Sequence, residues 1–327
     1  MGGERKPKLS AERQVAFLAE RGVKFDVVNK DKACEFLTKH TYFYKLKSYC
    51  VNYAKDESDR YVDLDFAYLI DLSTIDMHLR RFVNTLTLNV EHILKTKLLA
   101  DFNESPFDGY DIVDSFLNCK QGEKALKYIK GRQSSSADYL PKLPSDLKNL
   151  PIWHFVEIVQ FGHLLVFCDH FYDRLQTSSN KESPICVSLK LAREQYFSVK
   201  HALYNVKCLR NAAAHNNCVL LLNRNNATMQ QNAFDFLYLE VFQRRNGRKI
   251  KEFLKCRATN DLTSSLWVFD KLCKSAKMKR RSFVELKRML RGRFARNRDY
   301  YRNNSLIRNK YQFMLSVANY FYKQSVS

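Results

Sequence analysis

A short motif near residue 210 carries the residue types best suited to chemistry. The sequence Arg-Asn-Ala-Ala-Ala-His, residues 210–215, brings together a guanidinium, an amide and an imidazole. An imidazole moves protons near neutral pH, and a guanidinium can hold two phosphate oxygens at once. We therefore interpret Arg210, Asn211 and His215 as a candidate site for RNA phosphodiester cleavage that needs no metal ion.

A helix end must position this motif. Residues 188–214 are helical by their apolar period, and Asn211 and His215 are four residues apart. On a helix they lie one above the other, with Arg210 one position round. The three alanines between them allow another surface to approach closely. The alternative is a structural role, in which Arg210 pairs with a local carboxylate and His215 caps the helix.

Composition favours an all-α fold for the elements around the motif. The 327 residues include only 9 Gly and 6 Pro, so there are few signals for turns, while 23 Phe and 18 Tyr can fill a core. Residues 63–102 contain neither Gly nor Pro, and their apolar residues step by three or four. This pattern predicts one long helix or two abutting helices. The Asn-rich stretch after residue 215 predicts a turn region with a short strand at Cys218–Leu222.

The positive charge is concentrated in the last quarter of the chain. The net charge is +21, and residues 241–327 hold 23 basic and 5 acidic residues. Arginines interleaved with Phe and Tyr suit single-stranded or looped RNA, whose bases stack on rings and guanidinium planes. A solvated helix face, a surface for anionic lipid and duplex DNA binding are the alternatives. We expect RNA contacts from basic residues of two regions: Lys45, Lys47, Lys279, Arg280, Arg281, Arg288, Arg291, Arg293, Arg296, Arg298 and Arg302.

Several other classes of protein are disfavoured. No run approaches the roughly 18 apolar residues of a membrane span, and the nine Cys form no CxxC pair. We expect a cytoplasmic protein with reduced thiols, no membrane association and no cofactor. A metal site is also not expected, although His154, Glu157, His163 and His170 share one predicted helical stretch. Five polar residues of the 63–102 helix could form a buried ion-pair network, which we favour, or contacts to a ligand: Asp76, His78, Arg80, Arg81 and Glu91.

Several blocks of the sequence together resemble the Abi-like proteins of bacterial abortive infection, of the AbiD/AbiF type. The resemblance runs from about residue 8 to residue 225. It rests on six blocks in order: Lys8-Leu9-Ser10 with Arg21-Gly22; Tyr42 to Tyr49; Leu72, Asp76, Leu79 and Arg80; Glu91; Pro151, Trp153, Glu157 and Gly162; and Arg210 to Asn216. One departure is that Tyr49 directly follows Ser48, without the glycine of the family's tyrosine block.

The resemblance implies a helical fold of the HEPN superfamily and a metal-independent endoribonuclease. Arg210 and His215 would form the active site, assisted by Asn211, and the products would carry 2′,3′-cyclic phosphate and 5′-hydroxyl ends. Since the chain has one copy of the motif, a homodimer across Arg210 and His215 is implied. The resemblance also implies a structured non-coding RNA that binds and restrains or guides the protein, as in toxin–antitoxin systems of phage defence.

Three regions follow from charge, periodicity and this resemblance. Residues 1–60 would form an N-terminal helical segment, residues 61–230 a HEPN-like helical core, and residues 231–327 a basic helical RNA-binding extension. Two other functions stay open, namely an RNA-binding scaffold without catalysis and a DNA-binding regulator.

Overall fold

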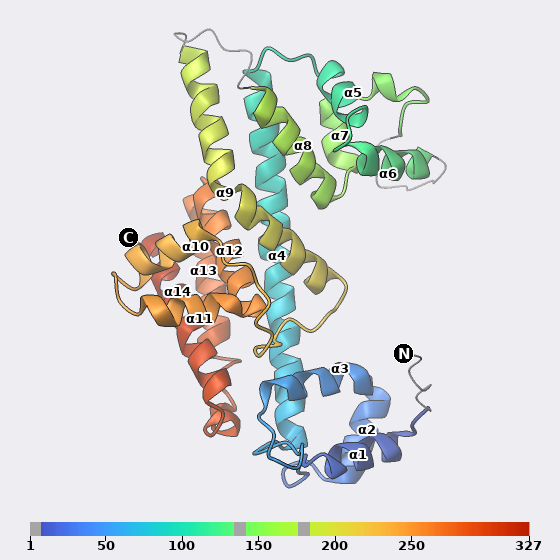
Figure 1. Ribbon diagram of the computed structural model, residues 1–327, viewed down its shortest axis with the longest axis vertical. Coiled ribbons are helices and arrows are strands. Elements are labelled where there is room, and N and C mark those ends of the chain that lie inside the picture. Colours follow the sequence, from blue (N-terminus) through green and yellow to red (C-terminus); the bar gives the residue numbers. More distant parts are fainter. Residues whose placement is uncertain (1–7, 134–141, 176–183, 327) are drawn as a thin grey trace. The chain divides into compact units, whose positions relative to one another are not determined.

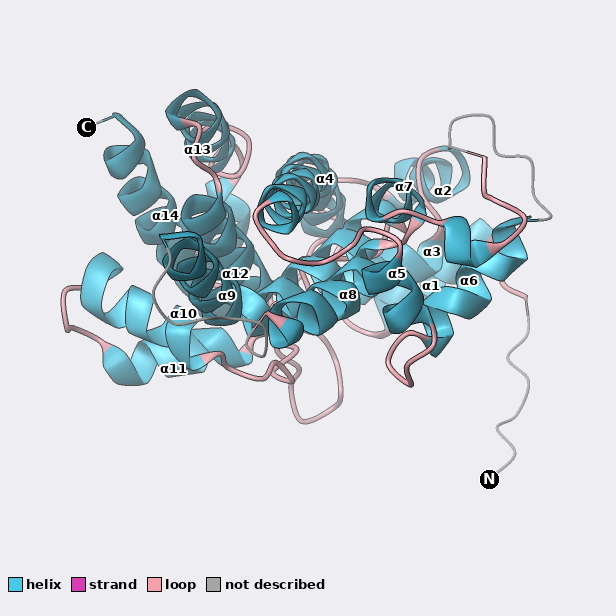
Figure 2. Ribbon diagram, turned by 90° about the horizontal axis from the view of Figure 1, so that it is seen from above, coloured by secondary structure: helices cyan, strands magenta, loops and turns pink. Residues whose placement is uncertain are grey.

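The computed structural model describes residues 8–133, 142–175 and 184–326. In these ranges the fold is all-α, as predicted, with fourteen α-helices and no strand (Figures 1 and 2). The strand prediction for Cys218–Leu222 was therefore wrong. Two isolated β-bridges, Lys24–Asp65 and Lys55–Tyr61, are the sheet-like pairings of the described residues.

The chain forms two compact units, and each is described by itself. Unit 1 comprises the described residues of Met1–Leu86, Cys208–Trp267 and Ser275–Ser327, and unit 2 those of Thr87–Lys207 and Val268–Lys274. Unit 1 thus contains residues from all three regions of the sequence analysis, and that functional division stays a prediction. Three helices have residues in both units: α4 (Phe66–Asn103), α9 (Pro184–Ala214) and α12 (Arg257–Leu272).

The remaining helices each belong to one unit. In unit 1 they are α1 (Ala11–Glu20), α2 (Lys30–Lys39), α3 (Phe43–Ser48), η1 (Tyr49–Asn52), α10 (Gln231–Phe236), η3 (Leu237–Val241), α11 (Gly247–Lys255), α13 (Ala276–Arg291), η4 (Arg298–Tyr301) and α14 (Ser305–Val326). In unit 2 they are α5 (Asp111–Leu117), α6 (Glu123–Gln133), η2 (Leu147–Asn149), α7 (Ile152–Ile158) and α8 (Phe161–Arg174).

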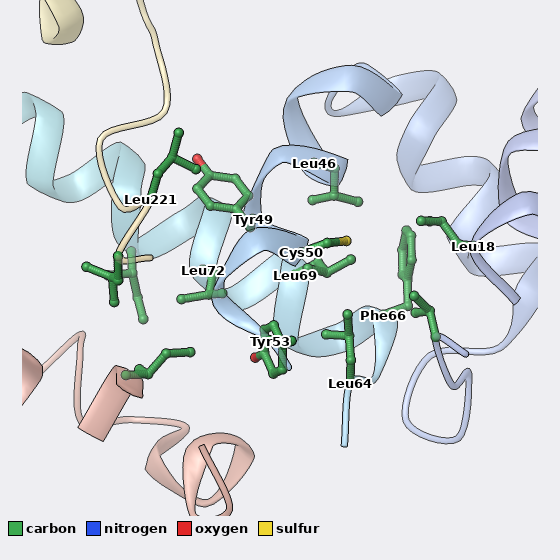
Figure 3. Close-up of a cluster of buried hydrophobic side chains, with 14 of the residues drawn as sticks. Leu18, Leu46, Tyr49, Cys50, Tyr53, Leu64, Phe66, Leu69, Leu72 and Leu221 are labelled. Atoms are coloured by element: carbon green, nitrogen blue, oxygen red, sulfur yellow. The ribbon is translucent and has the colours of Figure 1, made fainter. Parts of the chain in front are cut away.

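Helix α4 supplies one wall of the unit 1 core. The predicted stretch forms a single helix because nothing within it removes an amide or favours a turn. Its apolar stripe is buried at Leu69, Leu72, Ile75 and Leu79. The core continues onto α1, α3 and the segment after α9, where Leu18, Leu46 and Leu221 meet the same cluster (Figure 3). Residues far apart in sequence are thereby fixed beside the first turns of α4.

Helix α13 is amphipathic and lies against α14. Ser275 caps its first turn by accepting a hydrogen bond from the Met278 amide. Its apolar face is buried, and the Phe283 ring stacks on Phe321 of α14 with centroids 4.8 Å apart. The arginines of α13 are consequently held on the opposite, solvent-facing side, where Arg280, Arg281, Arg288 and Arg291 are exposed.

Unit 2 has an aromatic core of its own. The rings of Phe116, Phe155 and Phe167 lie 4.6–5.8 Å apart between centroids. The His170 ring of α8 contacts Ser115 Oγ at 3.0 Å, which gives this histidine a local partner. Within the described ranges, no group of three or more His, Cys, Asp or Glu side chains is placed to hold a metal ion.

Candidate functional site

The motif near residue 210 lies at the C-terminal end of α9, and Asn216 ends that helix. Asn216 has a left-handed backbone with φ of 56°. Its amide donates to the Ala213 carbonyl at 3.1 Å, and the next amide, of Asn217, donates to the Ala212 carbonyl at 2.8 Å. These two bonds form a Schellman motif, in which asparagine takes the position usually held by glycine. His215 is therefore the last residue before the turn, and the backbone of the next residue does the capping.

A buried lysine holds this turn from α3. The Lys45 ammonium donates to the Asn216 carbonyl at 2.9 Å and to Asn216 Oδ1 at 2.8 Å. The Lys45 side chain is only 7% exposed. Burial and the nearby Arg80 guanidinium lower its pKa. Since the ammonium is engaged here, Lys45 is placed to position the His215 helix end.

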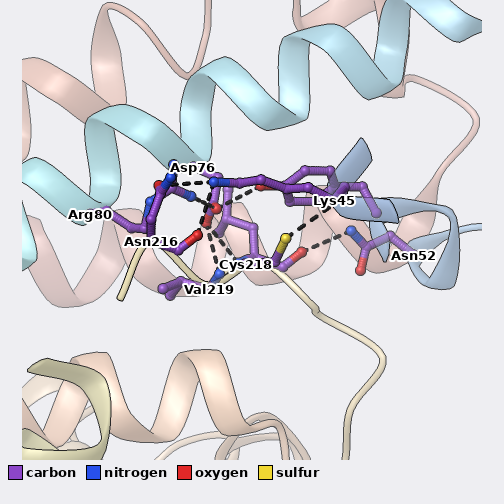
Figure 4. A network of polar contacts seen from close by, with 9 residues as sticks. Lys45, Asn52, Asp76, Arg80, Asn216, Cys218 and Val219 are labelled. Atoms are coloured by element: carbon purple, nitrogen blue, oxygen red, sulfur yellow. Dashed lines mark hydrogen bonds and ion pairs between the residues drawn. The ribbon is translucent and has the colours of Figure 1, made fainter. Parts of the chain in front are cut away.

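Asp76 of α4 anchors the segment that follows the turn (Figure 4). Its Oδ1 accepts hydrogen bonds from the backbone amides of Val219 and Leu220, at 3.1 and 2.9 Å. Its Oδ2 accepts from the Tyr49 hydroxyl at 2.6 Å and from the Arg80 guanidinium one turn along α4. Asp76 is fully buried and Arg80 is 6% exposed, which confirms the predicted buried ion pair.

A buried asparagine completes the hold on the segment. Asn52 Nδ2 donates to the Leu220 carbonyl at 2.9 Å, and Asn52 Oδ1 accepts from the Leu222 amide at 2.7 Å. The amides of Val219, Leu220 and Leu222 are thus satisfied by side chains, and the Leu221 amide donates to the Val219 carbonyl at 2.9 Å. These bonds leave no amide of residues 219–222 for a neighbouring strand, so this apolar run forms no sheet.

The pKa values of Asp76 and its neighbours Tyr49 and Cys218 follow from burial and pairing. Burial raises the pKa of the Asp76 carboxyl, and Arg80 with the hydrogen-bond donors acts in the opposite direction. Burial and the adjacent Asp76 raise the pKa of the Tyr49 hydroxyl, so Tyr49 stays a proton donor to Asp76. Burial also raises the pKa of the Cys218 thiol, whose Sγ contacts the Lys45 carbonyl at 3.6 Å. The cluster therefore suits a supporting role rather than proton transfer.

The three predicted catalytic residues lie within six positions at the end of α9, and the structure records a side-chain contact between Arg210 and Asn211. Arg210 is half-buried, and its guanidinium donates to Asn211 Oδ1 at 3.2 Å. Asn211 and His215 are exposed, and the His215 amide bonds the Asn211 carbonyl at 3.0 Å, as expected within a helix. A cation, an amide and an accessible imidazole on one rigid helix end can bind a phosphate and exchange a proton with it.

A second surface of unit 1 is strongly basic. An open hollow of about 1430 Å³ is formed along α13, with His78 of α4 and Tyr322 of α14 at its sides. Burial and three neighbouring arginines lower the pKa of His78, as a positive potential requires. The hollow has one acidic residue, Glu285, and seven cationic ones: Lys277, Arg280, Arg281, Lys287, Arg288, Arg291 and Arg293.

The predicted RNA-binding residues fall into separate groups. Arg280, Arg281, Arg288, Arg291 and Arg293 line the basic hollow, whereas Arg298 and Arg302 line an apolar cavity described below. Lys279 is half-buried, and Arg296 is exposed outside both sets of lining residues.

Besides Lys45, two further predicted contacts, Arg293 and Lys47, have partners within the protein that stabilise it. Arg293 donates to the buried Asp71 carboxylate at 3.2 Å. The Lys47 ammonium lies over the Phe17 ring, 4.4 Å from its centroid. Arg293 and Lys47 therefore also stabilise unit 1 itself.

The fold and this site define an all-α protein with an exposed arginine, asparagine and histidine at a clamped helix end. The chain belongs to the Abi-like family, since the family model described as Abi-like protein matches residues 35–220, more than half of its length. This family is named for abortive infection, which is a phage-defence response. No curated protein and no solved structure matches the chain.

We refer to Lys45, Asn52 and Asp76, which hold the turn and segment after His215, as the clamp. The matched range covers the clamp and the motif together. It contains Lys45, Tyr49, Asp76 and Arg80 as well as residues 210–215, and it ends at residue 220. The basic hollow of α13 lies outside it. Among the described residues no helix is both long and apolar enough to cross a membrane.

Sequence reasoning missed the residues that hold the motif in place. Lys45 was interpreted as an RNA contact, and Asn52 was not singled out. The signal for Lys45 was its place in a short, aromatic-rich helix beside the buried Leu46, where a buried lysine must find an acceptor. The signal for Asn216 was an asparagine directly after a helical run of alanines.

Proposed function

We propose that the protein is a metal-independent endoribonuclease of phage defence, with Arg210, Asn211 and His215 as its catalytic residues. In this proposal the Arg210 guanidinium holds the scissile phosphate and stabilises the charge that develops on it. The His215 imidazole moves the proton of the 2′-hydroxyl or of the leaving oxygen. Attack of the 2′-oxygen on phosphorus breaks the bond to the 5′-oxygen, which leaves 2′,3′-cyclic phosphate and 5′-hydroxyl ends.

One observation carries the proposal, namely the clamped and accessible end of α9. Lys45 and the left-handed Asn216 fix the turn directly after His215, and the imidazole itself is exposed. A catalytic group needs a rigid mount and access to substrate, and a histidine that serves only packing needs neither. Membership in the Abi-like family supports the same reading.

The test is a cleavage assay on end-labelled RNA in the presence of EDTA. Bound RNA is first removed at high salt, and the A260/A280 ratio of the protein confirms its removal. We expect His215→Ala to lower the single-turnover rate by about 10²–10⁴-fold, the usual contribution of general acid–base catalysis. The matched control is His201→Ala, which removes another exposed histidine of α9. Equal rates for wild type and His215→Ala, or no cleavage by RNA-free wild type, would refute the nuclease.

We further propose that two copies of the chain assemble across Arg210 and His215. The small, exposed Ala214 lies next to His215 at the helix end and leaves room for a second surface. Light scattering should give twice the chain mass of 38.5 kDa. Ala214→Arg should yield monomers that do not cleave, while Ala100→Arg, at an exposed alanine of α4, should change neither property. A cleaving monomer would contradict this assembly.

A second candidate function is an RNA-binding scaffold without catalysis. In either function, a structured non-coding RNA would bind the protein and restrain or guide it. The basic hollow favours the scaffold, because seven cationic residues along α13 attract a polyanion independently of the α9 motif. Folded RNA and duplex DNA are compared at matched salt. Tight binding of folded RNA by a chain that never cleaves would establish the scaffold, and a preference for duplex DNA would indicate a regulator.

A further inference from the structure

Unit 1 encloses an apolar cavity that neither the α9 motif nor the basic hollow uses. Its volume is about 440 Å³, within the roughly 300–1,000 Å³ typical of small-molecule sites. Its walls come from α4, α12, α13, α14 and the segment after α9. Leu72, Ile75, Leu222, Leu262 and Leu286 are among the lining residues, and all five are buried.

Four of the five charged residues that line this cavity are cationic, namely Arg298, Arg302, Arg308 and Lys310. Arg298, Arg302 and Arg308 line it and are exposed, so this part of the lining is in contact with solvent. Asp299 is the one acidic lining residue. An apolar interior with arginines at its edge is complementary to a molecule with an apolar body and an anionic end.

A buried lysine adds to this positive character. Lys310 of α14 also lines the cavity and is only 6% exposed. Its ammonium lies over the Phe253 ring, 5.0 Å from the centroid. Burial lowers the pKa of Lys310, with Cys256 acting in the opposite direction. Lysines are seldom buried this deeply, and the Glu252 carboxylate also favours the charged form of Lys310.

We propose that this cavity binds a free long-chain carboxylate of the fatty-acid type. The acyl chain would fill the leucine-lined interior, and the carboxylate would pair with the guanidinium groups of Arg298 and Arg302. Burial of apolar surface supplies most of the binding free energy, and the arginines select an anionic end over a neutral one. The proposal does not depend on nuclease activity.

The cavity shares a wall with the clamped segment of the α9 motif. Leu220 and Leu222 line it, and the amides of the same two residues are held by Asp76 and Asn52. A bound acyl chain therefore packs against the segment that follows His215. Because the ligand binds only the folded unit, it should raise the melting temperature of unit 1, by about 5–10 °C at roughly 100 times its Kd.

The test is calorimetric titration of the full chain with dodecanoate below its micelle concentration, together with thermal melting. We expect saturable binding of dodecanoate, at least about tenfold weaker binding of dodecanol, and none of acetate. The double variant Arg298→Gln with Arg302→Gln should weaken dodecanoate binding about tenfold. The control Arg248→Gln changes an arginine of α11 whose side chain is 96% exposed, and it should bind like wild type.

Three results of the titrations would each overturn the proposal. They are the absence of saturable dodecanoate binding, equal affinity for dodecanol, and equal affinity of the double arginine variant. Phosphatidylglycerol vesicles present acyl chains within a bilayer, so binding to vesicles without binding to free dodecanoate would also overturn it. Ala258→Phe places a ring among the lining residues and should abolish binding. If Ala258→Phe does not fold, the double variant Arg298→Gln with Arg302→Gln and its control Arg248→Gln still test the proposal.

Discussion

Replacement of Asp76 by asparagine tests whether the clamp fixes the His215 helix end. The carboxylate accepts from two amides through Oδ1 and from Tyr49 and Arg80 through Oδ2. An asparagine keeps one acceptor and turns the other into a donor. If its oxygen stays on the amides, its nitrogen faces two donors, and Arg80, 6% exposed, loses its carboxylate. If the side chain flips, the amides of the segment lose their acceptor instead.

The expected cost follows from these contacts. Removal of one partner from a buried ion pair costs about 3–5 kcal/mol. Domains are usually stable by only about 5–15 kcal/mol, so Asp76→Asn should fold but unfold at much lower urea concentration. Amide exchange at Val219 and Leu220 should accelerate on the order of 10²–10³-fold, since about 1.4 kcal/mol corresponds to a factor of ten. The rate of RNA cleavage should also fall, because the segment after His215 is no longer held in place.

Helix α4 offers a matched control in Asp71. Asp71 is also a buried carboxylate, 4% exposed, and it accepts from Arg293, Asn297 and Tyr301. Asp71→Asn should therefore cost a similar free energy of unfolding without touching the segment after His215. Urea unfolding, hydrogen exchange and cleavage are measured on both variants. If the Val219 and Leu220 amides exchange equally in the two variants, or if both cleave equally well, the clamp does not position the motif.

Three further predictions concern the turn, an exposed ring and the basic hollow. Asn216→Ala should destabilise unit 1 by about 1–2 kcal/mol more than Asn216→Gly in urea unfolding, because only glycine adopts a φ of 56° without strain; equal costs would contradict this. Tyr44, 78% exposed on the helix of the clamping Lys45, should stack an RNA base, so Tyr44→Ala should weaken single-stranded RNA binding by about 1–3 kcal/mol in fluorescence anisotropy. Unchanged affinity would refute that contact. Arg288→Gln with Arg291→Gln should reduce the salt slope of RNA affinity by about 1.4, if both contact phosphates; an unchanged slope would place the RNA elsewhere.

Sequence patterns predicted the helices and the family. These predictions succeeded where a structural feature depends on residues that are close in the sequence. The stretch now seen as α4 shows its period without interruption, so its helical state and buried stripe followed from spacing, whereas the choice between one helix and two was decided by the structure. The buried Asp76–Arg80 pair followed in the same way, because i and i+4 positions adjoin on a helix. The family resemblance added support for the Arg210 motif, because the spacing of Arg210 and His215 alone is not specific.

Contacts between distant segments could not be predicted in this way. Lys45 and Asn216 are 171 residues apart, and Asp76 and Leu220 are 144 apart. Residues 218–222 have the composition of a strand, and the strand prediction failed because Asp76 and Asn52 satisfy amides that a neighbouring strand would otherwise pair. Composition also cannot separate a lysine that binds RNA from one that binds a carbonyl, and only packing decided that for Lys45.

The geometry of the α9 end bears on how a nuclease of this kind could be controlled. Rigid mounting and open exposure of His215 are both present in a single copy of the chain. Electrostatic catalysis is far more effective once water is excluded, and an exposed imidazole lacks that protection. A single chain would then be a poor nuclease even with its catalytic residues in place. Covering of the site by a second copy would be the step that determines activity, and the clamp would let that step occur without refolding of the helix end.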